Sequence, residues 1–370
     1  RTHRRCSRRF SRSPTIMRID RQPAFSATLA ADIPFDALDT YLSTHIDGFA
    51  GPLHAERFKG GQSNPTYKLT TPQRSYVLRR KPFGKLLPSA HAIHREFQVT
   101  EALAGTGFPV AKPLHLCTDN SIIGADFYVM DFAEGRVFWE PHAPGLDGME
   151  RAALFSSLNT TIAQLHGFNP ADLGLADFGR PQGYVARQIK RWSEQYRASE
   201  TETIAEMDRL IEWLPGACPP DSTGAIVHGD FRLDNCIVHP VEPRIIAVLD
   251  WELSTIGDPL ADFTYHLMQW FMPISETGAG VGSLLAHLND PGVPAIADYV
   301  ARYCQRTGRD GIAELDTYLA YNFFRLAAIL QGILGRVRDG TAANAEAATM
   351  ARQVRPLAET AWNFAQRAGA

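Results

Sequence analysis

The spacing of apolar residues divides the chain into a strand-rich part followed by a mostly helical part. Near the N-terminus, Leu38, Leu42 and Ile46 recur every four residues, which predicts one amphipathic helix over residues 24–50. Alternating runs bounded by Gly and Pro then indicate strands, with one helical stretch between them. The strands are expected within residues 54–71, 75–82 and 125–132, and the helix within residues 90–107. We therefore predict a small α/β lobe over residues 51–131.

The rest of the chain has apolar residues at helical spacing, interrupted by one predicted hairpin. Helices are expected over residues 148–168, 184–198 and 202–214. Two strand-like runs, NCIVHP and RIIAVLDW, flank the turn-like sequence PVEP, which predicts an antiparallel pair. The chain beyond residue 134 is therefore expected to be mostly helical.

Composition places the protein among ordinary globular chains, and its 370 residues suggest two lobes or domains. No apolar run approaches the roughly 18 residues that a membrane-spanning helix needs, so we expect no membrane insertion. The net charge of −3 argues against a dedicated nucleic-acid binder. Five widely spaced cysteines without a CxxC pair exclude a disulfide scaffold and a zinc ribbon, and they favour the reducing cytoplasm.

The first 23 residues form a separate Arg-rich segment. Residues 1–19 contain seven arginines and no acid, and without them the net charge falls to −10. We interpret residues 1–23 as a disordered extension, or as sequence translated ahead of a start at Met17. Organellar targeting is the alternative, because transit peptides are also rich in Arg and Ser and poor in acids.

The candidate chemistry lies in residues 226–262. A short predicted strand leads into a loop that carries Asp230, and Asn235 follows five residues later. In the predicted hairpin, whose turn is centred near residue 242, Asn235 and Asp250 face each other across the ladder. Two carboxylates and one amide therefore converge. Hard oxygen donors of this kind, completed by phosphate oxygens and water, are what a Mg²⁺-nucleotide needs.

This order of residues resembles the kinase catalytic loop and metal-binding aspartate. With HGD in place of HRD, DWE in place of DFG and an adjoining GDPLADF, the chain resembles the aminoglycoside phosphotransferase and choline kinase-like family. That family's nucleotide loop is matched by FKGGQSNPTYKL, its cation-bearing strand by YVLRRKP, the helix with the acidic partner by HREFQVTEAL, and the hinge by YVMDFAEGRVF. Among the branches of this family, these segments most closely resemble one whose members occur alone in bacteria and are fused ahead of acyl-CoA dehydrogenase domains elsewhere.

The resemblance implies an α+β, bilobal protein-kinase-like fold. Residues 24–134 would form the nucleotide-binding lobe with its leading helix, and residues 135–370 the catalytic and substrate lobe. The implied activity is transfer of the γ-phosphate of ATP, with Mg²⁺, to a hydroxyl group of a small molecule. We favour a hydroxyacyl-CoA or a related metabolite as the acceptor. The net charge of −10 outside the Arg-rich segment would attract a cationic acceptor, so an aminoglycoside is the alternative substrate. A nucleotide-binding regulatory module without turnover is the alternative from another functional class.

The resemblance also implies roles in the catalytic loop. Asp230 would be the general base that orients the acceptor hydroxyl, and Arg232 would stabilise charge on the transferring phosphate. A salt bridge to Asp234 or Asp258 is the alternative role for Arg232. Asn235 and Asp250 would hold Mg²⁺. Asp258 and Asp262, in the GDPxxD pattern, would brace the catalytic loop and anchor the following helix.

In the small lobe, strand alternation puts Val77 and Arg79 on one face. By resemblance Val77 would roof the adenine, Arg79 would contact the phosphates, and Glu96 would be the partner of that cation. Better-known family members have lysine at this position, so Arg80 or Lys81 could take the role instead. The other expected nucleotide-binding residues are Gly60, Gly61, Ser63 and Asn64 in the loop and Met130, Asp131 and Ala133 in the hinge.

One further hypothesis is a metal hydrolase that uses His228, Asp230, His239 and Asp250. Against it, the sequence has no helical HxxxH pair, and His228 is better interpreted as structural.

Overall fold

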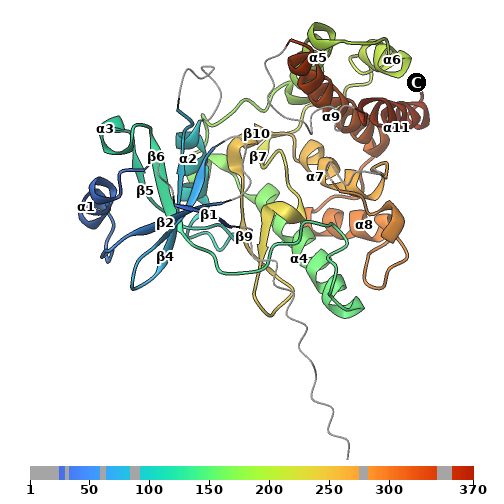
Figure 1. The fold of residues 1–370 in the computed structure, drawn as a ribbon. Coiled ribbons are helices and arrows are strands. Elements are labelled where there is room, and N and C mark those ends of the chain that lie inside the picture. The colour runs from blue at the N-terminus through green and yellow to red at the C-terminus, as the bar shows by residue number, and fades with distance from the viewer. Residues whose placement is uncertain (1–24, 30–32, 59–63, 84–91, 275–281, 340–351) are drawn as a thin grey trace, which may run out of the picture.

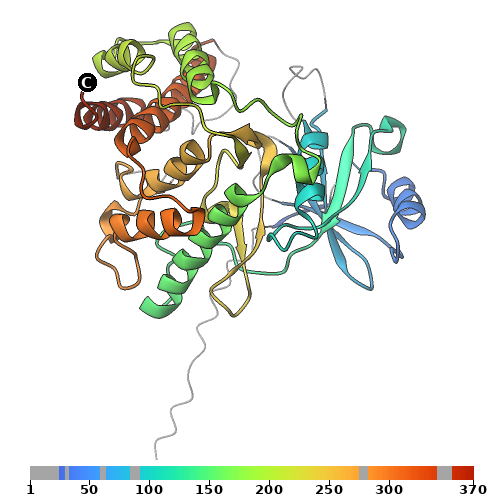
Figure 2. The ribbon, with the colours of Figure 1, turned by 180° about the vertical axis from the view of Figure 1, so that it is seen from behind.

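The computed structural model shows two lobes joined at one side, with the small lobe in blue and teal and the larger one in green to red (Figures 1 and 2). It describes residues 25–29, 33–58, 64–83, 92–274, 282–339 and 352–370. The predicted bilobal α+β architecture is confirmed. Within the described residues, no helix is long and apolar enough to cross a membrane.

The small lobe is built on a six-stranded sheet in the order β1-β2-β3-β4-β6-β5, and all neighbouring strands run antiparallel. The strands are β1 (Phe25–Leu29), β2 (His54–Phe58), β3 (Thr66–Thr70), β4 (Ser75–Arg80), β5 (Pro113–Cys117) and β6 (Phe127–Asp131). The helices are α1 (Phe35–His45), α2 (Ile93–Leu103) and α3 (Asn120–Ile123). Buried side chains of α1 and of strands β2, β3, β4 and β6 form the core of this lobe.

The prediction of one helix over residues 24–50 is wrong. The helix begins after Pro34 and ends at His45, while Phe25–Leu29 forms β1 at the edge of the sheet. Proline disfavours helical backbone in the residue before it, so the helix cannot extend upstream through Pro34. The buried residues Leu38 and Leu42, which carried the prediction, do face the core.

The large lobe confirms the three predicted helices, which are α4 (Gly148–Gly167), α5 (Tyr184–Ser199) and α6 (Ala205–Trp213). It continues with α7 (Pro259–Leu267), α8 (Ile296–Thr307), α9 (Leu315–Arg338) and α11 (Val354–Arg367). Short 3₁₀ turns are η1 (Pro170–Leu173), η2 (Leu233–Asn235), η3 (Trp251–Leu253), η4 (Met268–Trp270) and η5 (Leu285–His287). Helix α9 is buried on most sides and packs against α5, α7 and α11, which explains its nearly continuous apolar sequence.

Two small antiparallel strand pairs of the large lobe position candidate site residues. Strands β8 (Cys236–Val238) and β9 (Ile245–Val248) form the predicted hairpin, with Cys236 opposite Val248. Strands β7 (Ala225–Val227) and β10 (Thr255–Gly257) pair with each other, and β10 was not predicted. The first pair presents Asn235 at its end, and the second carries the loop that contains Asp230.

Candidate active site

A cleft of about 450 Å³ lies between the two lobes. Its wall in the small lobe comes from β3, β4 and β6, and its wall in the large lobe comes from the β8–β9 hairpin and the residues after β9. The sequence-predicted residues that line it are Val77, Arg79, Met130, Asp131, Ala133, Asn235 and Asp250. Residues from both lobes therefore meet at one concave site, as the motif order predicts.

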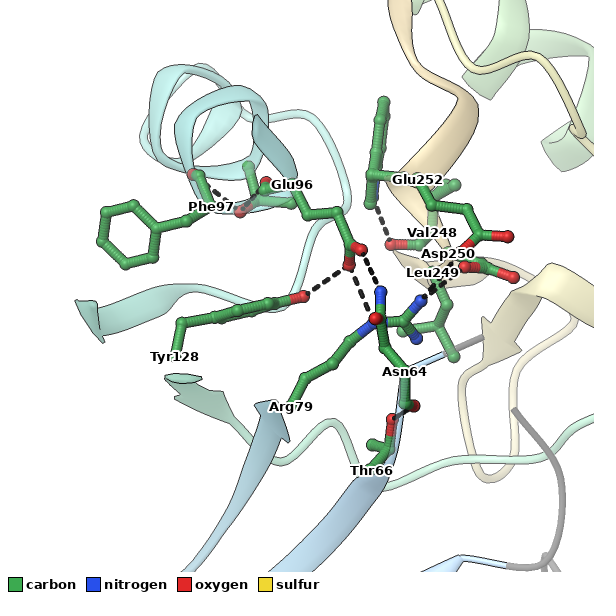
Figure 3. A network of polar contacts seen from close by, with 12 residues as sticks. Asn64, Thr66, Arg79, Glu96, Phe97, Tyr128, Val248, Leu249, Asp250 and Glu252 are labelled. Carbon is green, nitrogen blue, oxygen red and sulfur yellow. Dashed lines mark hydrogen bonds and ion pairs between the residues drawn. The ribbon is translucent and has the colours of Figure 1, made fainter. Parts of the chain in front are cut away.

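Arg79 joins the lobes across the cleft (Figure 3). Its Nε lies 2.8 Å from Oε2 of Glu96 on α2, and its Nη2 lies 2.9 Å from Oδ1 of Asp250 in the large lobe. Glu252 is a further acid, 3.7 Å from Nη2. Burial opposes the charge on Arg79, but the Glu96, Asp250 and Glu252 carboxylates raise its pKa above the usual value. The guanidinium is therefore a fixed positive charge at the inner end of the cleft.

Three donors hold Glu96 in place (Figure 3). Besides Arg79, Asn64 Nδ2 donates to Oε1 at 2.8 Å, and Tyr128 Oη donates to Oε2 at 3.1 Å. Burial raises the pKa of Glu96 to about 7, although Arg79 acts in the opposite direction. The Asn64 side chain thus binds Glu96, a contact that the assignment to the nucleotide loop did not include. Gly60, Gly61 and Ser63 lie outside the described residues.

The structure separates the three candidate cations at the end of β4 and directly after it. Only Arg79 faces the cleft among Arg79, Arg80 and Lys81. The Arg80 guanidinium stacks over the Phe83 ring at 3.8 Å, and Lys81 pairs with Asp126. Strand alternation accounts for Arg80, which points to the opposite face from Arg79, whereas Lys81 lies just beyond the last residue of β4.

The loop after β7 is held by buried hydrogen bonds. Asp262 on α7 accepts the backbone N–H groups of His228 and Gly229, both at 2.8 Å. His228 Nε2 lies 2.8 Å from the Leu249 carbonyl oxygen, which can only accept, so Nε2 carries the hydrogen. His228 Nδ1 then accepts from the Asp230 N–H at 3.2 Å. Both ring nitrogens of His228 are thus used, one by the loop itself and the other by the segment after β9, as its structural interpretation requires.

Gly229 in this loop has φ +86°, and a Cβ there would lie 2.9 Å from Leu253. Glycine is required at this position by the backbone conformation and by the close approach.

Asp230 is surrounded by hydrogen-bond donors. Tyr265 Oη donates to Oδ1 at 2.8 Å, Arg232 Nε lies 3.2 Å from the same oxygen, and Asn235 Nδ2 donates to Oδ2 at 3.0 Å. Arg232 also pairs with Asp234 at 2.9 Å. Burial and the nearby Asp230 raise the pKa of Tyr265 above its usual value, so the phenol remains a donor. The carboxylate is thereby fixed in orientation.

Asn235 and Asp250 lie close to the predicted positions, with a shift of one residue. Leu249 N donates to Asn235 O at 2.8 Å, so Leu249 stands opposite Asn235 and Asp250 follows it. Asp250 has φ +63°, a left-handed conformation uncommon for a residue other than Gly. The Asn235 amide nitrogen is used by Asp230, which leaves Oδ1 as the atom for a cation. With the Asp250 carboxylate it provides hard oxygen donors that fit Mg²⁺.

The hydrolase hypothesis is contradicted over the described part of the chain. No group of three or more His, Cys, Asp or Glu side chains there is arranged to hold a metal. Both ring nitrogens of His228 are used by backbone groups, and His239 Nδ1 accepts from the backbone of Val241 and Glu242 in the hairpin turn. A metal in the cleft would therefore depend on the Asn235 amide, the Asp250 carboxylate and oxygens from a ligand.

Tyr128, Tyr265 and Glu252 are site residues that sequence reasoning missed. A signal existed for Tyr128, because strand alternation places it on the same face as Met130, and it pairs directly with Arg79 in the sheet. Tyr265 lies three residues after Asp262, which puts both on one side of α7.

A sequence model described as the phosphotransferase enzyme family matches residues 54–315. The chain belongs to this family. Its most similar solved structures include a provisionally named aminoglycoside phosphotransferase from Ralstonia eutropha. That protein is 46% identical, with a TM-score of 0.81 and coverage of 93% of this chain and 99% of the other. Its structural neighbours include aminoglycoside phosphotransferases and a choline kinase, which are small-molecule kinases.

Two further relatives of this phosphotransferase-family chain are informative. Acyl-CoA dehydrogenase family member 10 of Mus musculus is 42% identical over 343 residues, which are 91% of this chain and 32% of that protein. The chain thus spans about a third of that relative's length. A thermostable aminoglycoside phosphotransferase mutant, in complex with ADP and hygromycin B, shares the fold at 13% identity, with a TM-score of 0.57 and coverage of 88% and 97%.

Proposed function

We propose that this protein binds ATP with Mg²⁺ in the interlobe cleft and transfers the γ-phosphate to a hydroxyl group of a small molecule. One observation carries the proposal. Arg79 and Asp250 meet across the cleft, and Asn235, which also lines it, is hydrogen-bonded to Asp230. A cation, two oxygen donors for a metal and a candidate base thus form one connected group, which is what phosphoryl transfer requires.

The residues would divide the work as follows. Met130, Asp131 and Ala133 would offer backbone groups to the adenine below Val77, and Arg79 would bind the phosphates. Mg²⁺, held by Asn235 and Asp250, would neutralise charge on the β- and γ-phosphates. Without a nucleotide, Arg79 neutralises Asp250, so binding would exchange this ion pair for phosphate and metal contacts.

On the acceptor side, Asp230 would orient the hydroxyl and accept its proton. Arg232, which pairs with Asp230 and Asp234 in the structure, would turn toward the transferring phosphate and stabilise its charge. Gly60, Gly61 and Ser63, outside the described residues, remain predicted nucleotide-binding residues.

The proposed acceptor is a hydroxyacyl-CoA or a related hydroxylated metabolite. The relative named as an acyl-CoA dehydrogenase family member, alike over 91% of this chain, supports an acyl substrate. The name of the Ralstonia protein and the body charge of −10 support an aminoglycoside instead. The cytoplasm is the proposed compartment, which agrees with free thiols at Cys117, Cys218, Cys236 and Cys304.

A non-catalytic nucleotide-binding module is the second candidate. Arg79 in place of lysine is the observation that favours it. The presence of Asp230, Asn235 and Asp250, with Asn235 hydrogen-bonded to Asp230, opposes it, since a protein without turnover has no need of the base.

A panel of acceptors tests the proposal. Hydroxyacyl-CoA thioesters, the free hydroxy acids and aminoglycosides would each be incubated with ATP and Mg²⁺, and ADP release and product mass would be measured. We expect one class to give a phosphate ester with wild type but not with Asp230→Asn. ATP binding without ADP release for every acceptor would instead support the regulatory module.

A further inference from the structure

Helix α2 carries two neighbouring residues that point to different partners. Glu96 faces the sheet and binds Arg79, whereas Arg95, one position earlier and about 100° around the helix, faces the large lobe. Figure 1 shows α2 on the side of the small lobe that faces β7 and β10, and α2 packs directly against η3. The helix that fixes the cleft cation is therefore attached to both lobes.

The Arg95 guanidinium makes three contacts in the large lobe. Its Nη2 donates to the Phe178 carbonyl at 2.6 Å and to the Ser254 carbonyl at 3.4 Å, and its plane lies over the Phe178 ring at 4.1 Å. These partners are neutral, so the contacts combine charge with carbonyl dipoles and a π face. A planar, forked side chain makes these contacts together, and lysine can reproduce only some of them.

Ser254 contacts both the segment that follows Asp250 and the strand that leads to Asp230. We call this position the Ser254 junction. It ends the η3 turn that begins directly after Asp250, and its N–H donates to the Trp251 carbonyl. Its Oγ donates to the Val227 carbonyl at 2.8 Å, and Val227 directly precedes the loop with Asp230. Ser254 is buried, and Thr255 pairs with Val227 in the β7–β10 ladder. A contact to Ser254 therefore acts on the segments of Asp250 and Asp230 together.

We propose that Arg95 is a positioning residue that fixes α2 against the Ser254 junction and so sets the distance between the Arg79 cation and the Asp250 carboxylate. The inference rests on the proposed function, and it adds a residue that lies outside the cleft. Arg95 acts through Glu96 and Arg79 on one side and through Ser254 on the other.

The test compares Arg95→Ala and Arg95→Lys with Gln98→Ala, which changes an exposed residue of the same helix. Calorimetry of ATP binding with Mg²⁺, without acceptor, gives an affinity that does not depend on turnover. Arg95→Ala should weaken binding by roughly 2- to 30-fold, the range for residues that couple distant parts of a site. Arg95→Lys should recover only part of the loss, and Gln98→Ala should bind as wild type does.

A double variant separates positioning from general loss of stability. If Arg95 acts through Arg79, then Arg95→Ala should add little to the loss in Arg79→Ala, because no oriented cation remains. Amide hydrogen exchange without nucleotide should be faster across α2 in Arg95→Ala and in Arg95→Lys than in Gln98→Ala. The lysine variant keeps the charge and serves if the alanine variant does not fold.

Two results would overturn the inference alone. One is ATP affinity and α2 exchange in Arg95→Ala and Arg95→Lys equal to wild type. The other is a double variant, Arg95→Ala with Arg79→Ala, whose fold-loss of ATP affinity equals the product of the fold-losses in the two single variants. Failure of wild type itself to bind ATP with Mg²⁺ would overturn the proposed function and this inference together.

Discussion

Asp230 is the residue on which transfer should depend most directly. Its carboxylate is oriented by Tyr265, Arg232 and Asn235, but it is not among the residues that line the cleft. Asp230→Asn should therefore keep ATP affinity within a few-fold and lower kcat by roughly 10²–10⁴, the scale of lost general-base assistance. Calorimetry and steady-state kinetics check the two parts. Asp234→Asn, at the other acid that binds Arg232, is the matched control, and an unchanged kcat in Asp230→Asn would move the base elsewhere.

Arg79 and Glu96 should behave as one unit. Arg79→Ala should lower kcat/KM for ATP by roughly 10- to 100-fold, the scale of a lost charge-assisted hydrogen bond. Glu96→Ala should cause a smaller loss, and the double variant should be less impaired than the product of the two, because Glu96 would have no cation to orient. Arg79→Lys should restore only part of the activity.

Lys81→Ala is the control for the strand register, since Lys81 pairs with Asp126 away from the cleft. If Arg79→Ala had wild-type kinetics and Lys81→Ala failed to use ATP, Lys81 rather than Arg79 would be the residue that contacts the phosphates.

Much of the site at this scale could be predicted from motif spacing and strand alternation. The two-residue alternation of the strand predicted that Val77 and Arg79 face the cleft, and the order of the motifs predicted that Asn235 and Asp250 line the same site. The contacts of Tyr265 with Asp230 and of Asn64 with Glu96 could not be predicted. They join residues 35 and 32 positions apart, and no local period connects such pairs.

At the scale of elements, α7 holds the loop that carries Asp230 through Asp262. Its carboxylate accepts from His228 N and Gly229 N and lies 3.2 Å from His166 Nε2. Burial opposes ionisation, but the hydrogen bond and charge of His166, with the His228 contacts, hold the pKa of Asp262 below its usual value. A depressed carboxyl pKa adds stability that is present above the unfolded pKa of about 4 and is lost as pH falls through the folded pKa.

Asp262→Asn should therefore be less stable than wild type at pH 7 by roughly 2–3 kcal/mol, the worth of a hydrogen bond to a charged group. The difference between the two proteins should begin to shrink below about pH 4, where the carboxyl of the unfolded chain is protonated, and should be lost as pH falls through the lower pKa of the folded protein. Denaturant unfolding across this pH range measures both. A difference that stayed constant with pH would mean that the charge on Asp262 does not contribute.

The elements themselves show where sequence patterns succeed. Long amphipathic helices such as α4 and α5, and the β8–β9 hairpin with its PVEP turn, carry their own periodic or turn signals. Strand β10 has three residues, too few to show a period, and it forms because β7 lies beside it. Strand β1 was lost in a helix prediction that ignored the break at Pro34.

At the scale of the whole molecule, the Arg79–Asp250 pair lets each lobe neutralise a charge of the other. Asp250→Ala should remove a ligand of the proposed metal site and also release Arg79. Thermal stabilisation by ATP should then require Mg²⁺ in wild type but be nearly the same with and without Mg²⁺ in Asp250→Ala. Asp126→Ala, at the acid paired with Lys81, is the control. A variant that kept the wild-type dependence on Mg²⁺ would exclude Asp250 as a metal ligand.

The fate of the γ-phosphate is the most direct measure of what the two lobes do together. ATP with a radiolabelled γ-phosphate would be followed with Mg²⁺ and the acceptor class selected by the panel. We predict that wild type places the label in a phosphate ester on the acceptor hydroxyl, and that Asp230→Asn does so roughly 10²–10⁴ times more slowly. Label that stayed in ATP, or that appeared only as inorganic phosphate at saturating acceptor, would contradict transfer to an alcohol.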